Sequence, residues 1–544
     1  MKKTIMLFVS LLLLLSIALV GCSSNEKTDV SQESGGDGAV KIKVFAPQGA
    51  ETDLETNSFT KLAEEKFNID FEWQTTTFDA TSASEVRNIA LASGDYPDLF
   101  LLIPWVDQFS QTDLLRYGKQ GVVLPLNDLI DKHAPNIKKV LENHPYYKAM
   151  ATAPDGNIYG LPQLNECFHC SYGNKLWINT DWLEKLKLEM PTTTEELKNV
   201  LTAFKTQDPN GNGKQDEVPL SGSPSLVESS VIPYLMNGFI YDDSRSRLLL
   251  ENGKVNLAAN KEEWKEGLSY IKSLYEEGLI DKGAFSQNTE ALQKTGNNAE
   301  AQILGAATSM HPGVFVSEAE YQKDYDAAAP LKGPNAAYAT YNFPSSPGGA
   351  FVLTNNASEE VQIAAIKLVD YMFTQEGQIR SHFGEEGVSW RKHQEGDVAI
   401  EEKAEPILAQ IPSKEGEEPR NDSWGAMAQY YQPREFRDGW IQATDIYSPE
   451  GYERRLQEAT HLYEGKEPSE TFPHWAIWID PAVADEAAMI RTNIEDYIEQ
   501  NSLQFITGTK DLEKEWDAYV QGFEQLNLKR YLEIMQEAYD NSGL

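Results

Sequence analysis

The pattern of apolar and polar positions predicts an alternation of strands and helices after residue 40. Residues 42–46 and 69–73 alternate apolar and polar side chains as strands do, whereas residues 54–63 and 84–92 have helical spacing. Residues 98–103 form a short apolar run, which is typical of a strand buried in a parallel sheet. This order predicts an α/β lobe whose ligand crevice lies at the carboxyl ends of its strands.

The later part of the chain has a pattern richer in helices. Apolar residues fall at helical spacing over residues 264–275 and 516–523. A run of helix breakers over residues 344–349 precedes a short apolar strand at 350–353, and Ser358 followed by two acids has the pattern of a helix start. We therefore expect an enlarged, helix-rich second lobe and a return of the chain to the first lobe near residue 350.

The first 22 residues have the pattern of an export signal. Lysines precede an apolar run over residues 5–20, which is shorter than the roughly 20 residues that a bilayer span needs. The sequence Leu-Val-Gly-Cys at residues 19–22 resembles a lipobox, so we expect Cys22 to carry a lipid anchor; an ordinary signal peptide with a chance cysteine is the alternative. Residues 23–39 are small or polar and are expected to form a flexible tether.

Length and charge limit the class of protein and its partners. The 544 residues exceed what one compact core accommodates, so we expect at least two domains. We also expect the protein to be a monomer. With 47 Lys and Arg against 84 Asp and Glu, the formal net charge is −37, which repels nucleic acid and anionic lipid. A neutral ligand is the simpler expectation, although a local basic cleft can override the overall charge.

Five short segments, in this order, resemble the family 1 extracellular solute-binding proteins of ABC importers, which are relatives of maltose-binding protein. They are Ala-Ser-Gly-Asp-Tyr-Pro-Asp-Leu at residues 92–99, and the segments 156–162, 177–193, 384–390 and 505–519. The last two are similar to the larger lipoprotein subfamily. Each segment alone is weak because Gly, Pro and Asp clusters also mark turns, but the set spans nearly the whole exported chain.

The resemblance implies a type II periplasmic-binding-protein-like fold, with two α/β lobes joined by a multi-strand hinge. Because the chain of such proteins crosses between the lobes repeatedly, we expect residues 40–163 and 348–395 in lobe one and residues 164–347 and 396–544 in lobe two. The resemblance also implies a protein that binds an oligosaccharide or another carbohydrate, docks on ABC permease subunits in the membrane and catalyses nothing. No residue identifies the sugar.

Aromatic residues are candidates for sugar contacts, because sugar CH faces stack on flat rings while the hydroxyls need polar partners. The chain has 11 Trp and 24 Tyr. The tryptophans on breaker-rich segments are Trp105, Trp177, Trp390, Trp424, Trp440 and Trp475. The polar candidates beside them are Asp107, Asn165, Glu166, Arg391 and Asp438. For each residue, a place in the core or on the surface is the alternative.

Residues 208–217 have the spacing of an EF-hand-like calcium loop. The oxygen donors are the side chains of Asp208, Asn210, Asn212 and Asp216 and the backbone carbonyl of Lys214. The twelfth position is Pro219 rather than Glu, so Glu217 has to supply the closing carboxylate. A solvated turn without metal is the alternative. Similar loops in alginate-oligosaccharide-binding relatives hold a structural calcium, which favours a structural role here.

Two cysteines remain beside Cys22, in the sequence Cys167-Phe-His-Cys170. Because no second Cys/His pair occurs at zinc-site spacing and the chain carries an export signal, a redox or zinc site is disfavoured. A local disulfide and two unpaired thiols both remain open.

Two other functions compete with import. A secreted glycoside hydrolase fits an acidic, aromatic-rich lipoprotein and needs only a positioned pair of carboxylates. The sequence contains neither a Gly-x-Ser-x-Gly nor a His-Glu-x-x-His motif, and the segments above belong to binding proteins. A lipoprotein that presents its ligand to a membrane sensor is the third possibility.

Overall fold

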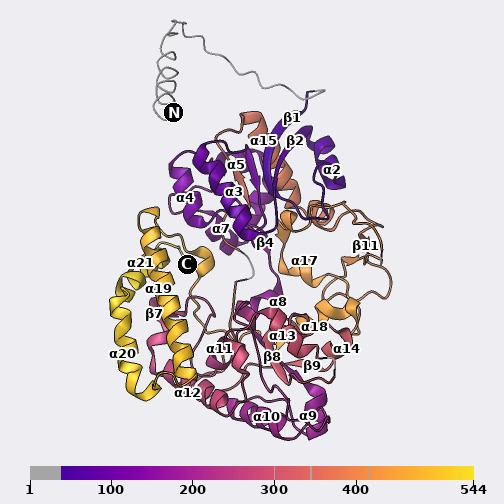
Figure 1. Ribbon diagram of the computed structural model, residues 1–544. Helices are drawn as coiled ribbons and strands as arrows, with labels where there is room; N and C mark the ends of the chain where they lie inside the picture. The colour runs from indigo at the N-terminus through magenta and orange to yellow at the C-terminus, as the bar shows by residue number, and fades with distance from the viewer. Residues whose placement is uncertain (1–37, 299, 344–345, 415) are drawn as a thin grey trace, which may run out of the picture. The chain divides into compact units, whose positions relative to one another are not determined.

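The computed structural model describes residues 38–298, 300–343, 346–414 and 416–544 (Figure 1). The predicted signal segment, its Cys22 and most of the predicted tether lie outside the described residues. Across the described ranges, no helix combines the length and the apolar character needed to cross a membrane.

A four-stranded sheet organises lobe one. The strands lie in the order β10-β3-β1-β2, with β1, β2 and β3 parallel and β10 antiparallel to β3. The strands are β1 (Val40–Pro47), β2 (Ile69–Thr76), β3 (Leu99–Leu101) and β10 (Phe351–Leu353). The helices of this lobe are α2 (Ser58–Phe67), α3 (Ala80–Ser93), α4 (Gln111–Lys119), α5 (Asn127–His133), α6 (Pro135–Asn143), α7 (Pro145–Ala151), α15 (Glu359–Met372) and α16 (Gln375–Gln378).

The predicted order of elements in lobe one is confirmed, and its turn residues explain part of it. Helix α3 ends because Gly94 adopts a left-handed conformation, with φ of 79°, that favours glycine. Four residues later the buried carboxylate of Asp98 accepts a hydrogen bond of 2.9 Å from the backbone N–H of Lys43. Burial raises the pKa of Asp98. This motif therefore ends the helix and fixes the start of β3 against β1.

The return of the chain to lobe one near residue 350 is also observed. Strand β10 adds to the edge of the sheet, and Ser358 caps α15 by accepting a hydrogen bond from the backbone N–H of Val361. The predicted apolar face of α15, which includes Leu368 and Val369, is buried in the same hydrophobic core as β1.

A smaller sheet organises lobe two. Its strands lie in the order β8-β5-β9, and both pairings are antiparallel, unlike those among β1, β2 and β3. The strands of this part are β5 (Lys175–Asn179), β8 (Ala306–Ser309), β9 (Tyr325–Ala328) and the hairpin β6 (Leu248–Glu251) and β7 (Lys254–Leu257). The helices around it are α8 (Phe168–Ser171), α9 (Thr180–Leu186), α10 (Thr194–Thr206), α11 (Val231–Met236), α12 (Glu262–Glu276), α13 (Thr289–Gly296), α14 (Ala319–Gln322) and α18 (Tyr452–His461).

Three helices at the end of the chain complete the core of lobe two. They are α19 (Pro481–Ile506), α20 (Leu512–Gln525) and α21 (Leu528–Asp540), drawn in yellow and gold in Figure 1. Trp516 and Phe523 of α20 are buried in one core with Trp264 of α12. The helix-rich second lobe predicted from the sequence is therefore observed.

The last third of the chain returns to lobe one more often than expected. Strand β13 (Tyr431–Gln432) pairs in parallel with β4 (Leu164–Asn165), and the segment before it packs in the core of lobe one. There the Trp424 ring meets Phe59 edge-on at 4.8 Å and its Nε1 donates to Thr60 Oγ1 at 2.9 Å. The assignment of the whole run 396–544 to lobe two is therefore corrected, because the burial of these rings draws the chain back.

The remaining elements are short. The segment between α16 and β13 contains a two-stranded antiparallel sheet, formed by β11 (Trp390–Lys392) and β12 (Leu408–Gln410), and α17 (Arg434–Asp438) follows β13. One π-helix, η5, spans Ile379–Phe383. The 3-10 helices are η1 (Val227–Ser229), η2 (Ala258–Asn260), η3 (Lys282–Phe285), η4 (Pro312–Val314), η6 (Gly425–Ala428), η7 (Pro449–Gly451) and η8 (His474–Ala476).

Candidate functional site

A cavity of about 650 Å³ is lined by residues of both lobes. This volume lies in the range of small-molecule sites. The lining comes from α4, from residues 241–248, 341–343, 346–347 and 471–479, and from α19 and α21. We refer to this site as the cavity. Its walls join chain segments that lie far apart in the sequence.

An aromatic stack forms part of the wall of the cavity. The rings of Phe343 and Trp475 lie 4.5 Å apart between centroids and are inclined by 25°. Tyr146 packs edge-on against Phe343 at 5.4 Å and supports the stack from the side of lobe one. Tyr341 and Phe472 also line the cavity. Flat rings of this kind offer the apolar faces on which sugar rings stack.

A polar trio of Asp243, Ser246 and His474 lines another part of the cavity. Asp243 Oδ2 accepts a hydrogen bond of 2.5 Å from Ser246 Oγ and lies 3.1 Å from His474 Nε2. Burial acts to raise the pKa of Asp243, which is 6% exposed, but the hydrogen bond and charge of His474 and the hydroxyl of Ser246 outweigh it and lower that pKa. The trio therefore holds an ionised carboxylate in a fixed position at the cavity wall.

Of the six predicted tryptophans, Trp475 lines the cavity. Three others lie in hydrophobic cores: Trp177 is 1% exposed on β5, and Trp390 and Trp424 are buried as well. The indole N–H of Trp177 donates to the carbonyl of Ser309 at 3.1 Å, and that of Trp390 donates to the carbonyl of Gly384 at 3.0 Å. For these three, ring and N–H are already engaged within the fold, so the expected ligand contact gains no support from the geometry.

The two remaining tryptophans lie outside the cavity. Trp105 is 60% exposed in a tight turn that follows β3, at the carboxyl edge of the parallel strands. The carboxylate of Asp107 in the same turn is held by two hydrogen bonds from Arg87, of 2.6 and 3.0 Å, so it forms a buried ion pair. Trp440 packs against the guanidinium of Arg437 at 4.4 Å.

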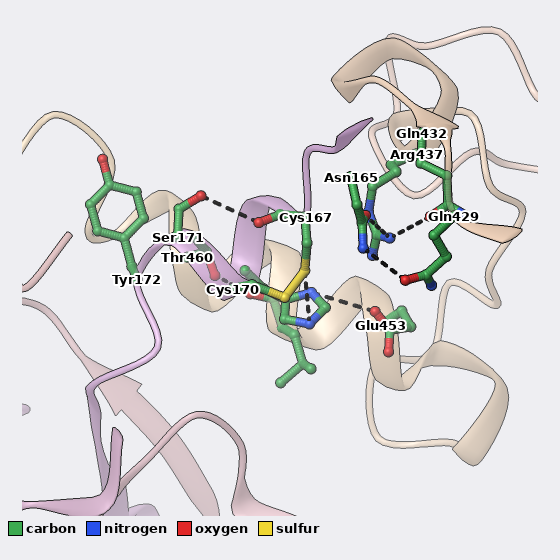
Figure 2. Close-up of a disulfide and its surroundings, with 12 residues drawn as sticks. Asn165, Cys167, Cys170, Ser171, Tyr172, Gln429, Gln432, Arg437, Glu453 and Thr460 are labelled. Atoms are coloured by element: carbon green, nitrogen blue, oxygen red, sulfur yellow. Dashed lines mark hydrogen bonds and ion pairs between the residues drawn. A yellow bond between two sulfur atoms is a disulfide. The ribbon is translucent and has the colours of Figure 1, made fainter. Parts of the chain in front are cut away.

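The polar candidates beside the crossings between lobes bind protein groups (Figure 2). Asn165 accepts a hydrogen bond of 2.9 Å from Arg437 and donates one of 3.2 Å to Gln429. Glu166 accepts from the Tyr146 hydroxyl at 2.6 Å and from the backbone N–H of Arg434 at 2.7 Å. These contacts tie β4 to the segment around β13.

The other two polar candidates are held in ion pairs. Arg391 forms a two-pronged pair with Asp397, with distances of 2.6 and 3.0 Å. Asp438 accepts from Arg434 on the same helix at 2.8 Å. Neither lines the cavity, so the sequence prediction of a hydroxyl contact gains no support from the geometry.

Cys167 and Cys170 form a disulfide in the turn of helix α8 that follows β4 (Figure 2). The ring of His169 lies beside it, with Nε2 at 3.5 Å from Cys167 Sγ and Nδ1 at 3.4 Å from Glu453. Burial lowers the pKa of His169, and the nearby charges of Arg437 and Lys175 lower it further. Of the two possibilities that the sequence left open, the structure shows the local disulfide.

Sequence reasoning missed most of the cavity. The missed residues with rings or hydrogen-bonding groups include Tyr241, Asp243, Ser246, Tyr341, Phe343, His474 and Arg491. Part of a signal was present, because residues 341–343 adjoin the breaker-rich run and His474 precedes Trp475. For Asp243 and Ser246 no motif marks the positions, since their partners come from distant segments.

The 208–217 loop forms a tight turn that is held by hydrogen bonds among its own residues. The carboxylate of Asp208 accepts hydrogen bonds from the backbone N–H groups of Asn212 and Gly213, at 3.1 and 3.0 Å. Gly213, the sixth position of the loop, has φ of 72°, which the sharp turn of a calcium loop requires. The side-chain amide of Asn212 lies 3.1 Å from Asp216.

One carboxylate oxygen in this loop lacks a hydrogen-bond partner among the described residues. Oε1 of Glu217 is buried and accepts no hydrogen bond among the described residues. Burial raises the pKa of Glu217, and the neighbouring carboxylates of Asp208 and Asp216 raise it further. The carboxylate oxygens of Asp208, Asp216 and Glu217 do not form a cluster of three within 4.8 Å of one another among the described residues. The residue types nevertheless match the hard oxygen donors that calcium prefers.

Two α/β lobes with a lined cavity that draws on both define a class, the two-lobed ligand-binding proteins. The sequence matches the bacterial extracellular solute-binding protein family over residues 30–379. The chain belongs to this family.

The relatives agree with this assignment. The fructooligosaccharide ABC transporter substrate-binding protein FusA of Streptococcus pneumoniae serotype 4 is 30% identical over 493 residues, covering 88% of this chain and 85% of FusA. The structure of FusA in complex with kestose superposes with a TM-score of 0.69 at 28% identity, covering 92% of this chain and 99% of the FusA chain in that structure. A FusA EF-hand mutant in complex with fructo-nystose gives a TM-score of 0.68 at 27% identity over the same shares. Lipoprotein LipO of Bacillus subtilis is 24% identical, covering 73% of this chain and 76% of LipO.

Proposed function

We propose that this protein captures an extracellular oligosaccharide in the cavity and delivers it to the permease of an ABC importer. The observation that carries the proposal is the Phe343–Trp475 stack beside the polar trio, in a cavity lined by both lobes. The rings supply apolar faces for sugar CH groups, and the trio supplies partners for hydroxyls. The similarity to FusA, whose name states fructooligosaccharide transport, supports the ligand class.

The architecture supplies a route from capture to delivery. Because ligand-binding groups come from both lobes, a bound sugar stabilises an arrangement in which both sets of contacts are made. A permease that docks on that arrangement receives loaded protein in preference to empty protein. Binding affinity and delivery are thereby coupled through the segments that cross between the lobes.

A panel of purified oligosaccharides tests the proposal. The soluble chain from residue 38 onward is mixed with neutral and acidic oligosaccharides, and thermal unfolding and released reducing ends are measured together. We expect a bound glycan to raise the melting temperature while the concentration of reducing ends stays constant. Turnover of any glycan would instead establish a glycoside hydrolase, and a panel without a single shift would overturn the proposal.

We further propose that the 208–217 loop binds one calcium ion in a structural role. Support comes from the like-charged carboxylates of Asp208, Asp216 and Glu217, which influence one another, and from the relative that is described as an EF-hand mutant. The loop lies outside the lining of the cavity, so the ion serves the fold of lobe two. Calorimetric titration of chelator-treated protein should give one site for calcium, and a flat titration would refute it.

A lipid anchor at Cys22 is the third part of the proposal. It is supported by the lipobox-like sequence and by the relative LipO, which is a lipoprotein. An anchor would keep the protein at the outer face of the cell membrane, close to the permease. In cells that produce the full chain, Cys22→Ala should move the protein from the membrane fraction to the medium. Retention of the variant in the membrane would contradict the anchor.

A further inference from the structure

The charged groups of the cavity carry information about the charge of its ligand. The cationic or titratable basic residues among the described lining are Arg116, Arg245, Arg491 and His474. In a site that recognises an acidic sugar, at least one such group would be left free to pair with the sugar carboxylate, since a buried carboxylate needs a cation or several donors.

Each of these basic residues already has an acidic partner. Arg116 lies 2.5 Å from Asp113 on the same helix, and His474 lies 3.1 Å from Asp243.

The other two pairs are longer. Arg245 lies 3.6 Å from Glu228, which is outside the lining, and Arg491 lies 3.7 Å from Glu495 on α19. Asp485, one turn and a half before Arg491, also lines the cavity and forms no ion pair among the described residues. The acids of the lining, Asp113, Asp243, Asp485 and Glu495, thus match its basic residues in number, so the cavity offers no excess of positive charge.

A uronate entering this cavity would meet two costs. It would have to compete with an acid for a guanidinium, or remain unpaired beside carboxylates of the same sign. A neutral sugar meets neither cost, because the stacked rings and the trio bind its CH faces and hydroxyls without requiring a charge. Since the exposed parts of these pairs are screened by salt, discrimination should be greatest at low ionic strength.

We propose that the cavity selects neutral oligosaccharides over oligosaccharides of uronic acids, and that Glu495 determines this specificity by occupying Arg491. This inference rests on the proposed function and adds to it the class of substrate. The ion pairs of the cavity lining would then discriminate between ligands by charge, whereas the aromatic stack binds the sugar ring.

Two matched panels test the inference by isothermal titration at low salt. One holds neutral gluco-, fructo-, galacto-, manno- and xylo-oligosaccharides, and the other holds oligogalacturonates and alginate oligomers of the same lengths. We expect the best neutral ligand to bind at least tenfold more tightly than any uronate, and the ratio to fall as salt is added. A uronate that binds as tightly as the best neutral ligand overturns the inference and leaves the proposed function intact. Binding by neither panel overturns both.

A variant tests the residue. Glu495→Gln frees the guanidinium of Arg491, and we expect it to raise the affinity for uronates at least threefold while the affinity for the neutral ligand changes less than twofold. Glu499→Gln, one turn further along α19 and outside the cavity lining, is the matched control and should leave both affinities unchanged. Equal uronate affinities in wild type and Glu495→Gln would refute the role of this pair.

Discussion

The 208–217 loop and the cavity place their functional groups in opposite ways. The donors of the loop lie within ten consecutive positions, and hydrogen bonds between neighbours, such as the one from Gly213 to Asp208, fix their geometry. The cavity takes Arg116 from lobe one, Asp243 from lobe two and Trp475 from a later crossing. The loop therefore depends on local sequence and the cavity on the whole fold. We expect the two sites to respond independently to mutation.

The largest expected effect concerns the loop. A double variant, Asp208→Ala with Asp216→Ala, removes two of the three carboxylates of the loop. At a hundredfold excess over its Kd, calcium should stabilise the wild type by about 2.7 kcal/mol, and the variant should lose this gain. Denaturant unfolding with calcium and with chelator measures it.

The matching control is Asp128→Ala with Asp131→Ala, two acids of helix α5 in lobe one, which should keep the calcium response. Glycan affinity of the loop variant, measured in calcium, should stay within about twofold of wild type, well under the tenfold that 1.4 kcal/mol represents. A parallel loss of glycan binding would show that the two sites are coupled and would break the comparison.

The next effect concerns the aromatic stack. Trp475→Ala removes one of the two stacked rings of the cavity, and we expect a loss of about 2 kcal/mol in glycan binding, or about 30-fold in Kd. The calcium response should be unchanged. Met489→Ala, an exposed side chain on α19 that does not line the cavity, is the control, with titration calorimetry as the measurement. An unchanged Kd for Trp475→Ala would move the sugar site elsewhere.

The free energy of unfolding should depend on pH through Asp243, which lines the cavity. Since its hydrogen bonds lower the pKa of Asp243 in the folded state, Asp243 contributes stability that is present above the unfolded pKa of about 3.9 and is lost as the pH falls through the folded pKa. Asp243→Asn should cost about 1.5 kcal/mol at pH 7 and flatten the dependence of unfolding free energy on pH below 4. Chemical denaturation from pH 2 to 7 measures it. If Asp243→Asn leaves the slope of unfolding free energy against pH unaltered, the hydrogen bonds of the trio do not stabilise the folded state.

The smallest expected effect concerns Trp105. This exposed ring at the carboxyl edge of the lobe-one sheet lies outside the cavity, so a ligand reaches it only when further contacts form with lobe one. We expect Trp105→Ala to weaken glycan binding by about 1 kcal/mol, or about fivefold. An effect as large as that of Trp475→Ala would extend the site across lobe one. No effect would confine it to the cavity.

The tryptophans show why site residues were harder to predict than elements. Apolar alternation predicted β1, β2 and the helices of lobe one, because burial on one face imposes the period of each element. The flat apolar ring that lets tryptophan stack on a sugar also favours its burial in a core. Trp177 and Trp424 lie in hydrophobic cores. A position on a segment rich in helix breakers does not show whether a tryptophan contacts a ligand or packs in the core.

The sequence by itself determined features whose partners lie close together along the chain. The cap at Ser358, the turn at Gly94 and the turn of the 208–217 loop all depend on hydrogen bonds or backbone conformation within a few residues. Each of these interactions requires particular residue types at a fixed spacing, so each interaction can be recognised in the sequence.

Only the tertiary structure decided which side chains line the cavity and how the chain returns to lobe one. Asp243 and His474 meet across 231 positions, and Trp424 buries its ring against Phe59 across a still longer stretch. Such contacts form because burial and hydrogen bonding depend on distance in space and impose no periodic pattern on the sequence. For the same reason, the ion pairs that set the charge of the cavity became visible only in the folded chain.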